Sequence, residues 1–284
     1  GHRKVKQVYL RTMKWTGNIR KMKTEYNDPV QYKLPLFDVL DFQEDLPMNQ
    51  FVGKTVKLTF ENQINCVVTG KKIRKTYGEG MSFDAWKSSP NAVESIIRPE
   101  LSRIHEGIAL RDKEWEEKHH NQPHIVYLSK TAGIKVGVTR DVNVPYRWID
   151  QGAIEAIVLA EVPYRQLAGL IEVSLKEHLS DKTNWRAMLK NDIIEDIPLI
   201  HAKEEALELL SEEFFDFISE DDEVTEISYP VEQYPEKVKS FKLDKVPETT
   251  AQLNGIKGQY LLFEGGNVIN LRSHAGYRVS IEVL

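Results

Sequence analysis

Cysteine is almost absent from this chain of 284 residues, in which Cys66 is the only thiol. One cysteine excludes an internal disulfide framework and fits a reducing compartment. Long apolar runs are also lacking: none approaches the roughly 18 residues that a membrane-spanning helix needs, and no signal-peptide pattern opens the sequence. An apolar content of 41% with 29% charged residues is typical of a globular protein with a real core. We therefore expect a soluble, cytoplasmic protein with no membrane partner.

The formal net charge of -5 hides an uneven distribution along the chain. Residues 1–120 contain 21 Lys and Arg against 16 Asp and Glu, residues 121–190 contain 9 against 7, and residues 191–284 contain 8 against 20. A basic surface attracts a polyanion. The first two thirds could therefore approach nucleic acid, whereas the last third could do so only through local patches. The alternative is that this modest split reflects solvated surface alone.

The middle of the chain alternates strand and helix signals. Apolar runs over 125–129 and 134–139 flank a polar connector that ends in Gly133, which predicts a hairpin. Pro145 fits the first turn of a short helix and Gly152 its end. Alternation over 154–162 predicts a third strand. Pro163 then opens a helix through Leu179, whose inward stripe is Leu167, Leu170, Ile171 and Leu175.

Two tripeptides and three polar residues follow one another on these elements. Val126-Tyr127-Leu128 lies on the first strand and Lys135-Val136-Gly137 on the second, and Arg147, Glu172 and Asn184 come later. In this order, the stretch from about Pro123 to Lys190 resembles the GIY-YIG endonuclease superfamily in a degenerate form. The surrounding chain is similar to an uncharacterised bacterial group with such a core in its middle. The resemblance implies a small three-stranded antiparallel sheet with helices.

The resemblance also implies hydrolysis of a phosphodiester with Mg²⁺ or Mn²⁺. Tyr127 would act as general base, which requires a lowered pKa because a free phenol titrates near ~10. Arg147 offers planar donors to a phosphate. Glu172 would hold the metal with mostly water ligands, and Asn184 would orient a phosphate or a metal-bound water.

The second strand carries the remaining candidates. Lys135 stands where active nucleases of this superfamily usually have tyrosine, although lysine could still stabilise a phosphate. Gly137 lacks a Cβ and would let a phosphate approach the backbone. Thr139 and Arg140 could contact the nucleic-acid backbone. The predicted catalytic residues are thus Tyr127, Lys135, Arg147, Glu172 and Asn184, with Gly137, Thr139 and Arg140 as nucleic-acid contacts.

Each of the main candidates has a structural alternative. Tyr127 on a strand can be an ordinary core residue, and Arg147 can pair with Asp150 or Asp141. Glu172 precedes Lys176 by four residues, the favoured order for an ion pair on a helix. Asn184 is a plausible helix cap.

Upstream of the core, the bacterial group suggests cysteines at spacings that suit zinc. Here the corresponding places are held by Thr69, Ser82, Ala85, Ser95 and Ser102, with only Cys66 left. Tetrahedral structural zinc requires thiolates or imidazoles, so we expect no zinc in this chain. His105, His119, His120 and His124 follow; they could form a residual metal site or belong to a solvated linker.

The two ends of the chain have strand character. We predict a strand over 8–15 that ends at Gly17, irregular chain over 18–52, and a half-buried hairpin whose arms, 56–60 and 64–68, flank a turn at 61–63. Near the other end, 260–263 and 268–271 form a hairpin around a glycine turn, and 277–283 is a last strand. A short helix from Asn184, with Met188 and Leu189 inward, and an acidic helix from Pro198 to about 220 lie between. The stripe of the acidic helix is Leu199, Ala202, Ala206, Leu209, Leu210, Phe214 and Phe217.

We therefore predict an α+β protein with a central GIY-YIG-like domain between β-rich flanks. Its segments are 1–65 (β), 66–122 (a zinc-ribbon-like segment without metal), 123–192 (the core domain), 193–230 (acidic helix and linker) and 231–284 (β, packing with 1–65). The first functional hypothesis is a metal-dependent nuclease acting on DNA or RNA. The second is a nucleic-acid-binding module without turnover. The third is a scaffold that recruits a protein through 198–226.

Overall fold

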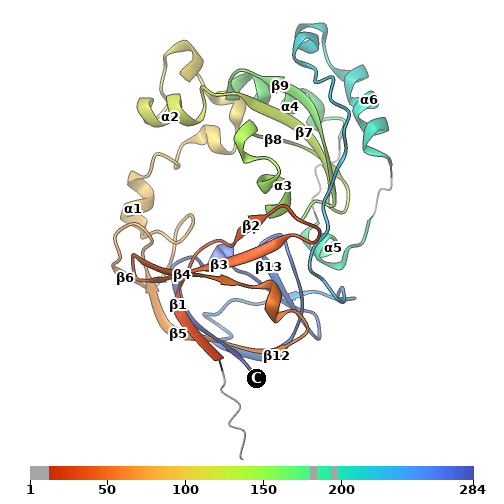
Figure 1. Cartoon of the computed structure of the whole chain (residues 1–284). Helices are drawn as coiled ribbons and strands as arrows, with labels where there is room; N and C mark the ends of the chain where they lie inside the picture. Colours follow the sequence, from red (N-terminus) through yellow and green to blue (C-terminus); the bar gives the residue numbers. More distant parts are fainter. Residues whose placement is uncertain (1–12, 180–183, 194–196) are drawn as a thin grey trace, which may run out of the picture.

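Two β-sheets organise the computed structural model, which describes residues 13–179, 184–193 and 197–284. An 11-stranded sheet curls into a half-barrel at one end of the molecule, and a four-stranded antiparallel sheet with its helices lies at the other (Figure 1). The protein is therefore a mixed α+β fold. Within the described residues, no helix is long and apolar enough to cross a lipid bilayer.

The large sheet has the strand order β11-β14-β13-β12-β5-β15-β1-β3-β2, with β4 paired to β3 and β6 paired to β5. Its strands are β1 (Met13–Ile19), β2 (Lys23–Glu25), β3 (Gln31–Asp38), β4 (Asp41–Pro47), β5 (Thr55–Asn65), β6 (Lys72–Ile73), β11 (Lys239–Ser240), β12 (Glu248–Lys257), β13 (Tyr260–Phe263), β14 (Asn267–Asn270) and β15 (Tyr277–Val283). Because β15 pairs with both β1 and β5, the sheet combines strands from both ends of the chain.

Three predictions for the first 70 residues are wrong. The segment 18–52 is not irregular but contains β2, β3 and β4. Gly17 does not end a strand; it pairs with Val279 inside β1. The predicted turn at 61–63 lies within β5, which continues through it with Asn62 in a left-handed conformation. The part of the predicted first strand before Met13 lies outside the described residues.

The small sheet has the order β10-β9-β7-β8. Its strands are β7 (His124–Lys130), β8 (Ile134–Arg140), β9 (Glu155–Val162) and β10 (Thr225–Glu226). The predicted hairpin of β7 and β8 is confirmed, with Tyr127 opposite Gly137. The sheet has four strands rather than three because β10 pairs with Ala156 and Glu155 of β9.

The described helices are mostly short. They are α1 (Phe83–Ser88), α2 (Lys113–His119), α3 (Tyr146–Asp150), α4 (Arg165–Lys176), α5 (Trp185–Lys190) and α6 (Leu199–Leu209). The 3-10 helices are η1 (Asn49–Phe51), η2 (Glu94–Ile96), η3 (Pro99–Leu101), η4 (Ile104–Glu106), η5 (Asp141–Asn143), η6 (Glu212–Phe217) and η7 (Arg272–His274). The predicted order of strand, strand, short helix, strand and long helix is therefore confirmed for β7 to α4.

The two faces of the small sheet belong to different cores. Val126 and Leu128 of β7 pack with α4 and α6, whereas Ile125 and Tyr127 pack with α3 and the large sheet. Because successive side chains of β7 point to opposite faces, this strand contributes to both cores and joins the two sheets. The helix α4 begins two residues later than predicted, at Arg165, and Leu170 is exposed rather than inward.

Residues 66–122 consist mainly of turns and short helices, apart from the two-residue strand β6. The backbone N–H groups of Thr69 and Ser82 donate to the Cys66 Sγ over 3.5 and 3.2 Å. Ser95 lies elsewhere, where its hydroxyl is 3.3 Å from the Nδ1 of His120. No group of three or more His, Cys, Asp or Glu that could hold a metal occurs in the part of the chain that the structure describes.

The acidic helix is shorter than predicted. It ends at Leu209, after which Leu210 and Ser211 are extended and η6 follows. Leu209 is exposed instead of buried. The buried Lys203 donates to the carbonyls of Ser219 and Asp221 and pairs with Asp222, so it anchors the acidic segment that follows η6. The helix α5, by contrast, buries Met188 and Leu189 as predicted.

Candidate functional site

A cationic cavity of about 520 Å³ opens at the edge of the small sheet. Among the described residues, its lining includes four arginines and no Asp or Glu. The lining residues are Asn91, Ile96, Trp115, His119, His120, Val138, Thr139, Arg140, Asn143, Arg147, Arg165 and Arg272. Of the predicted site residues, the structure therefore brings Thr139, Arg140 and Arg147 together in one cavity.

Three consecutive elements of the core place arginines around this cavity. Arg140 is the last residue of β8, which is an edge strand. Arg147 lies in the first turn of α3, and Arg165 is the first residue of α4. Arg272, at the start of η7, comes from the C-terminal part of the chain. β8 has no strand neighbour on its other side, so the four arginines line a cavity at the edge of the sheet.

The charges of Arg140 and Arg147 are not neutralised by carboxylates. Within the ranges that the structure describes, neither forms an ion pair with Asp or Glu. The alternative that pairs Arg147 with Asp150 or Asp141 is therefore wrong, because Asp150 pairs with Lys21 and accepts from the Gln259 side chain. Arg272, in contrast, forms an ion pair with Glu79.

Arg165 is the site residue that the sequence patterns miss. Its Nε donates to the Ser95 carbonyl over 2.8 Å and its Nη2 to the Ile96 carbonyl over 2.9 Å. Burial lowers the pKa of its guanidinium to about 10, with Arg147 and Arg140 lowering it further and Glu172 opposing them. Its position next to a predicted helix start is visible in the sequence, but its carbonyl partners lie about seventy residues away.

Two histidines and one tryptophan complete the wall formed by α2. The Trp115 ring packs edge-on against His120, with ring centroids 5.0 Å apart. It is tilted by 31° relative to the His119 ring, with centroids 4.6 Å apart. Burial lowers the pKa of His119, and it lowers the pKa of His120 to about 3, so both imidazoles are neutral at pH 7. His120 and His124 are almost fully buried, which contradicts the interpretation of this stretch as a solvated linker.

Tyr127 is buried and does not line the cavity. Its side chain is fully buried, its Oη donates to the Gln151 Oε1 over 3.0 Å, and its ring packs edge-on against Trp148. Burial raises the pKa of the phenol, although Arg147 and Gln151 oppose that change. A general base needs the opposite shift. The protonated phenol instead helps to hold α3, and with it Arg147.

Glu172 lies on the inner side of α4. It is buried, and its Oε1 is 3.4 Å from the Lys176 Nζ, the helix pair expected four residues apart. Its charge acts on both Arg165 and Tyr127, raising the pKa of each. One carboxylate suffices for Mg²⁺ when water and phosphate supply the remaining ligands. Glu172 carries one carboxylate, but it is buried and does not line the cavity.

The structure places the remaining candidates away from the cavity lining. Asn184 caps α5: its Oδ1 accepts from the backbone N–H groups of Arg186 and Ala187, and α5 packs on the large sheet. Gly137 faces the Tyr127 ring, which occupies the space that a phosphate would need. Lys135 lies on β8 opposite Ser129 and has contacts of its own.

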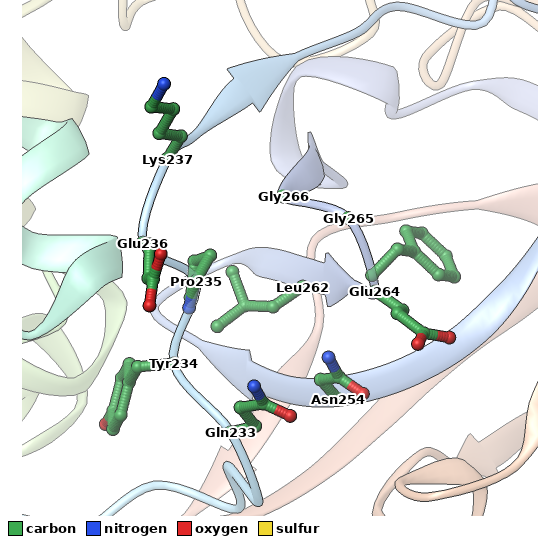
Figure 2. Close-up of a pocket in the computed structure, with 11 residues that line it drawn as sticks. Gln233, Tyr234, Pro235, Glu236, Lys237, Asn254, Leu262, Glu264, Gly265 and Gly266 are labelled. Atoms are coloured by element: carbon green, nitrogen blue, oxygen red, sulfur yellow. The ribbon is translucent and has the colours of Figure 1, made fainter.

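A second cavity, of about 330 Å³, lies on the large sheet (Figure 2). There the chain from Gln233 to Lys237 runs beside β12 and β13, opposite the turn at Gly265 and Gly266. Its described lining has two carboxylates, Glu236 and Glu264, and a single cation, Lys237. This balance gives it no preference for a polyanion, which leaves the arginine-lined cavity as the candidate nucleic-acid site.

The fold is thus a half-barrel sheet joined to a small antiparallel domain with an arginine-lined cavity at its edge. By sequence, the chain belongs to the family described as "Protein of unknown function (DUF2797)", whose model matches residues 53–279. No curated protein and no solved structure matches the chain. The family match covers the small sheet, the cavity and most of the large sheet. The resemblance of the core to GIY-YIG endonucleases stays a prediction.

Proposed function

We propose that this protein binds the phosphodiester backbone of DNA or RNA in the arginine-lined cavity. The observation that carries the proposal is the charge of the described lining: four arginines, of which only Arg272 is paired with a carboxylate (Glu79), and no Asp or Glu. The planar guanidinium matches two phosphate oxygens at once, and its charge persists at any physiological pH.

The surroundings of the arginines support a nucleic acid over a small free anion. The cavity opens to the surface beside the edge strand β8, and a nucleic-acid strand would lie across this opening. Trp115 offers an aromatic surface beside the cations, and base stacking on aromatic side chains adds affinity of about 1–3 kcal/mol per base. Neutral His119 and His120 can donate or accept hydrogen bonds there without adding charge.

The predicted GIY-YIG core fits this function better as a binding module than as a nuclease. A sealed Tyr127 with a raised pKa cannot reach a substrate water as a base. The side-chain oxygen of Asn184 already accepts a hydrogen bond as the cap of α5, and Glu172 is paired with Lys176. The arginines, by contrast, already line a cavity where they could contact a phosphate.

A second candidate function is hydrolysis of the bound strand with Mg²⁺ or Mn²⁺. It is favoured by one observation: the Glu172 carboxylate lies on the same helix as Arg165, close enough to raise the pKa of that guanidinium. Here the metal would polarise a phosphoryl oxygen. Arg147 and Arg165 would bind the phosphate, and Tyr127 would support Arg147. The scaffold hypothesis for residues 198–226 stays a prediction without a specific observation in its favour.

Fluorescence anisotropy with labelled single-stranded and duplex oligonucleotides tests the binding function. We expect binding by the wild-type protein and at least tenfold weaker binding by Arg140→Gln/Arg147→Gln. Arg98→Gln/Arg103→Gln, which removes two exposed charges that do not line the cavity, is the matched control. Failure of the wild type to bind either strand form would overturn the proposal.

Incubation of the same oligonucleotides with Mg²⁺ or Mn²⁺ then separates the two functions. Cleavage that is lost in Glu172→Ala while binding persists would establish the hydrolase. Binding without cleavage in the presence of either metal would support the non-catalytic binding module.

A further inference from the structure

Three aromatic side chains gather on the surface of the segment that leads from β6 into α1. The ring centroid of Tyr77 is 5.2 Å from that of Phe83 and 6.1 Å from that of Trp86, and the Phe83 and Trp86 centroids are 6.1 Å apart. Phe83 is 49% exposed and Trp86 is 37% exposed. Among the described residues, none of the three rings belongs to a hydrophobic core. Adjacent exposed rings that no core uses mark a contact surface for a partner.

The turn before α1 fixes the position of these rings. Tyr77 and Met81 exchange two backbone hydrogen bonds, of 2.8 and 3.0 Å. Gly78, inside that turn, has a left-handed conformation, and a Cβ added to it would lie 3.0 Å from the Trp86 Cδ1. The glycine therefore lets the turn pass close to the indole. Rings that are held before a ligand arrives reduce the cost of ordering them on binding.

Basic side chains accompany the rings along the same segment. Between residues 71 and 87 the sequence has five Lys and Arg against two Asp and Glu. The Nζ of Lys75 lies 5.2 Å from the Tyr77 ring centroid, and one of the two carboxylates, Glu79, is already paired with Arg272. We call the three rings and the exposed basic residues the basic aromatic surface; these basic residues are Lys71, Lys72, Arg74, Lys75 and Lys87. Positive charge beside aromatic faces is the combination by which proteins bind single strands.

The segment that carries this surface reaches the wall of the cationic cavity on both sides of α1. Before α1, Glu79 accepts from the Nε of Arg272 over 2.7 Å, and Arg272 lines the cavity. After α1, the Nε of Arg111 donates to the Ser89 carbonyl over 2.8 Å, and Asn91, two residues further on, lines the cavity. In Figure 1, α1 lies between β6 and α2. The basic aromatic surface therefore adjoins the proposed phosphate-binding site.

We propose that the basic aromatic surface stacks the unpaired bases of a single-stranded nucleic acid whose backbone lies in the cationic cavity. This inference rests on the function proposed above and adds the class of substrate. An unpaired base can lay its ring face on an aromatic side chain, whereas in a duplex the neighbouring base pairs cover those faces. The lysines would contact the phosphates between stacked bases. The protein should therefore prefer a single strand to a duplex.

Fluorescence anisotropy of the full-length protein with labelled oligo(dT) and with the oligo(dA)–oligo(dT) duplex tests this preference. We expect the wild type to bind oligo(dT) at least tenfold more tightly than the duplex. Phe83→Leu/Trp86→Leu keeps apolar side chains but removes the ring faces. It should weaken oligo(dT) binding at least tenfold and change duplex affinity less than twofold. Oligo(U), tested in parallel, should show the same dependence, because an unpaired RNA base has the same ring faces.

The matched control is Phe215→Leu. Phe215 is 48% exposed, close to the 49% of Phe83, but it lies on η6. This variant should bind both strand forms as the wild type does. Because duplex affinity is measured on every variant, a protein that merely fails to fold is recognised by the loss of both forms together with its circular dichroism spectrum.

Photocrosslinking of the wild-type protein to oligo(dT) that contains 5-bromodeoxyuridine needs no variant. Residues 76–87 form one tryptic peptide that contains all three rings, and mass spectrometry should find the crosslink there. The proposal is overturned if crosslinks occur only in other peptides, or if the folded double variant keeps its oligo(dT) affinity or loses both forms equally. Duplex binding that depends on Arg140 and Arg147 would still support the cationic cavity in those cases, so the two proposals fail separately.

Discussion

Tyr127 and Gly137 face each other across the β7–β8 hairpin, and the phenol lies directly over the glycine. A Cβ added to Gly137 would be 2.4 Å from both the Cζ and the Oη of Tyr127. The glycine is therefore required by the ring of its cross-strand partner. Through this packing and the bond to Gln151, the hairpin fixes the base of α3, from which Arg147 reaches the cationic cavity.

Gly137→Ala should destabilise the protein by about 1–3 kcal/mol, the usual cost of forcing a methyl group into a packed core. Chemical denaturation monitored by circular dichroism measures this change. Gly133→Ala is the matched control on the same hairpin. No described atom lies within 4 Å of the position that its new methyl group would take, so it should change stability by less than about 0.5 kcal/mol. Equal effects of the two substitutions would contradict the packing described.

The buried histidines predict a loss of stability in acid. Burial lowers the pKa of His120 to about 3 and the pKa of His124 to about 4, below the usual 6.5. The unfolded chain therefore binds protons at a higher pH than the folded chain. Stability should be fully present above about pH 6.5 and decline as the pH falls toward 4, by an amount on the order of 1–3 kcal/mol per histidine.

Denaturation curves between pH 4 and 7.5 check this prediction. The variant His124→Gln should show a flatter decline than the wild type, whereas His178→Gln, which replaces an exposed histidine outside these clusters, should keep the full slope. Identical pH slopes in all three proteins would show that the imidazoles are not buried in neutral form.

Asn184→Ala should cost about 1 kcal/mol of stability, because it removes a side chain that accepts from two backbone N–H groups at the start of α5. Oligonucleotide affinity should stay within twofold of the wild type. Asn184→Ser or Asn184→Asp, which also cap helices, should restore most of the stability. A large loss of nucleic-acid affinity in Asn184→Ala would instead show that this residue takes part in binding.

Local signals in the sequence predict the core correctly, from the hairpin loop before Gly133 to the strand that ends at Val162. They fail where a strand is fixed by pairing with another strand that the local sequence does not reveal. The strand β5 continues through Asn62 because β15 pairs along both halves of it, and no local pattern reveals that partner. Likewise β3 contains Pro35, which is typical of irregular chain, yet β4 pairs along its length.

The residues of the candidate site also fall into those that local sequence signals predict and those that they do not. Arg147 and Arg140 are predictable because they follow recognisable strand and helix signals. Arg165 is not, since what fixes it is a pair of carbonyls at Ser95 and Ile96, in a segment with weak periodicity. The sequence predicts a catalytic task for Tyr127, but the burial of this side chain depends on Trp148 and the large sheet, which only the tertiary structure brings together.

The salt dependence of oligonucleotide binding tests the central claim most directly. Each phosphate contact contributes about 0.7–0.9 to the slope of log affinity against log salt concentration. We predict that Arg140→Gln/Arg147→Gln reduces the magnitude of that slope by about 1–2, while Arg98→Gln/Arg103→Gln leaves it unchanged. An unchanged slope in the cavity variant, or an equal reduction in both variants, would contradict the assignment of this cavity as a phosphate-binding site.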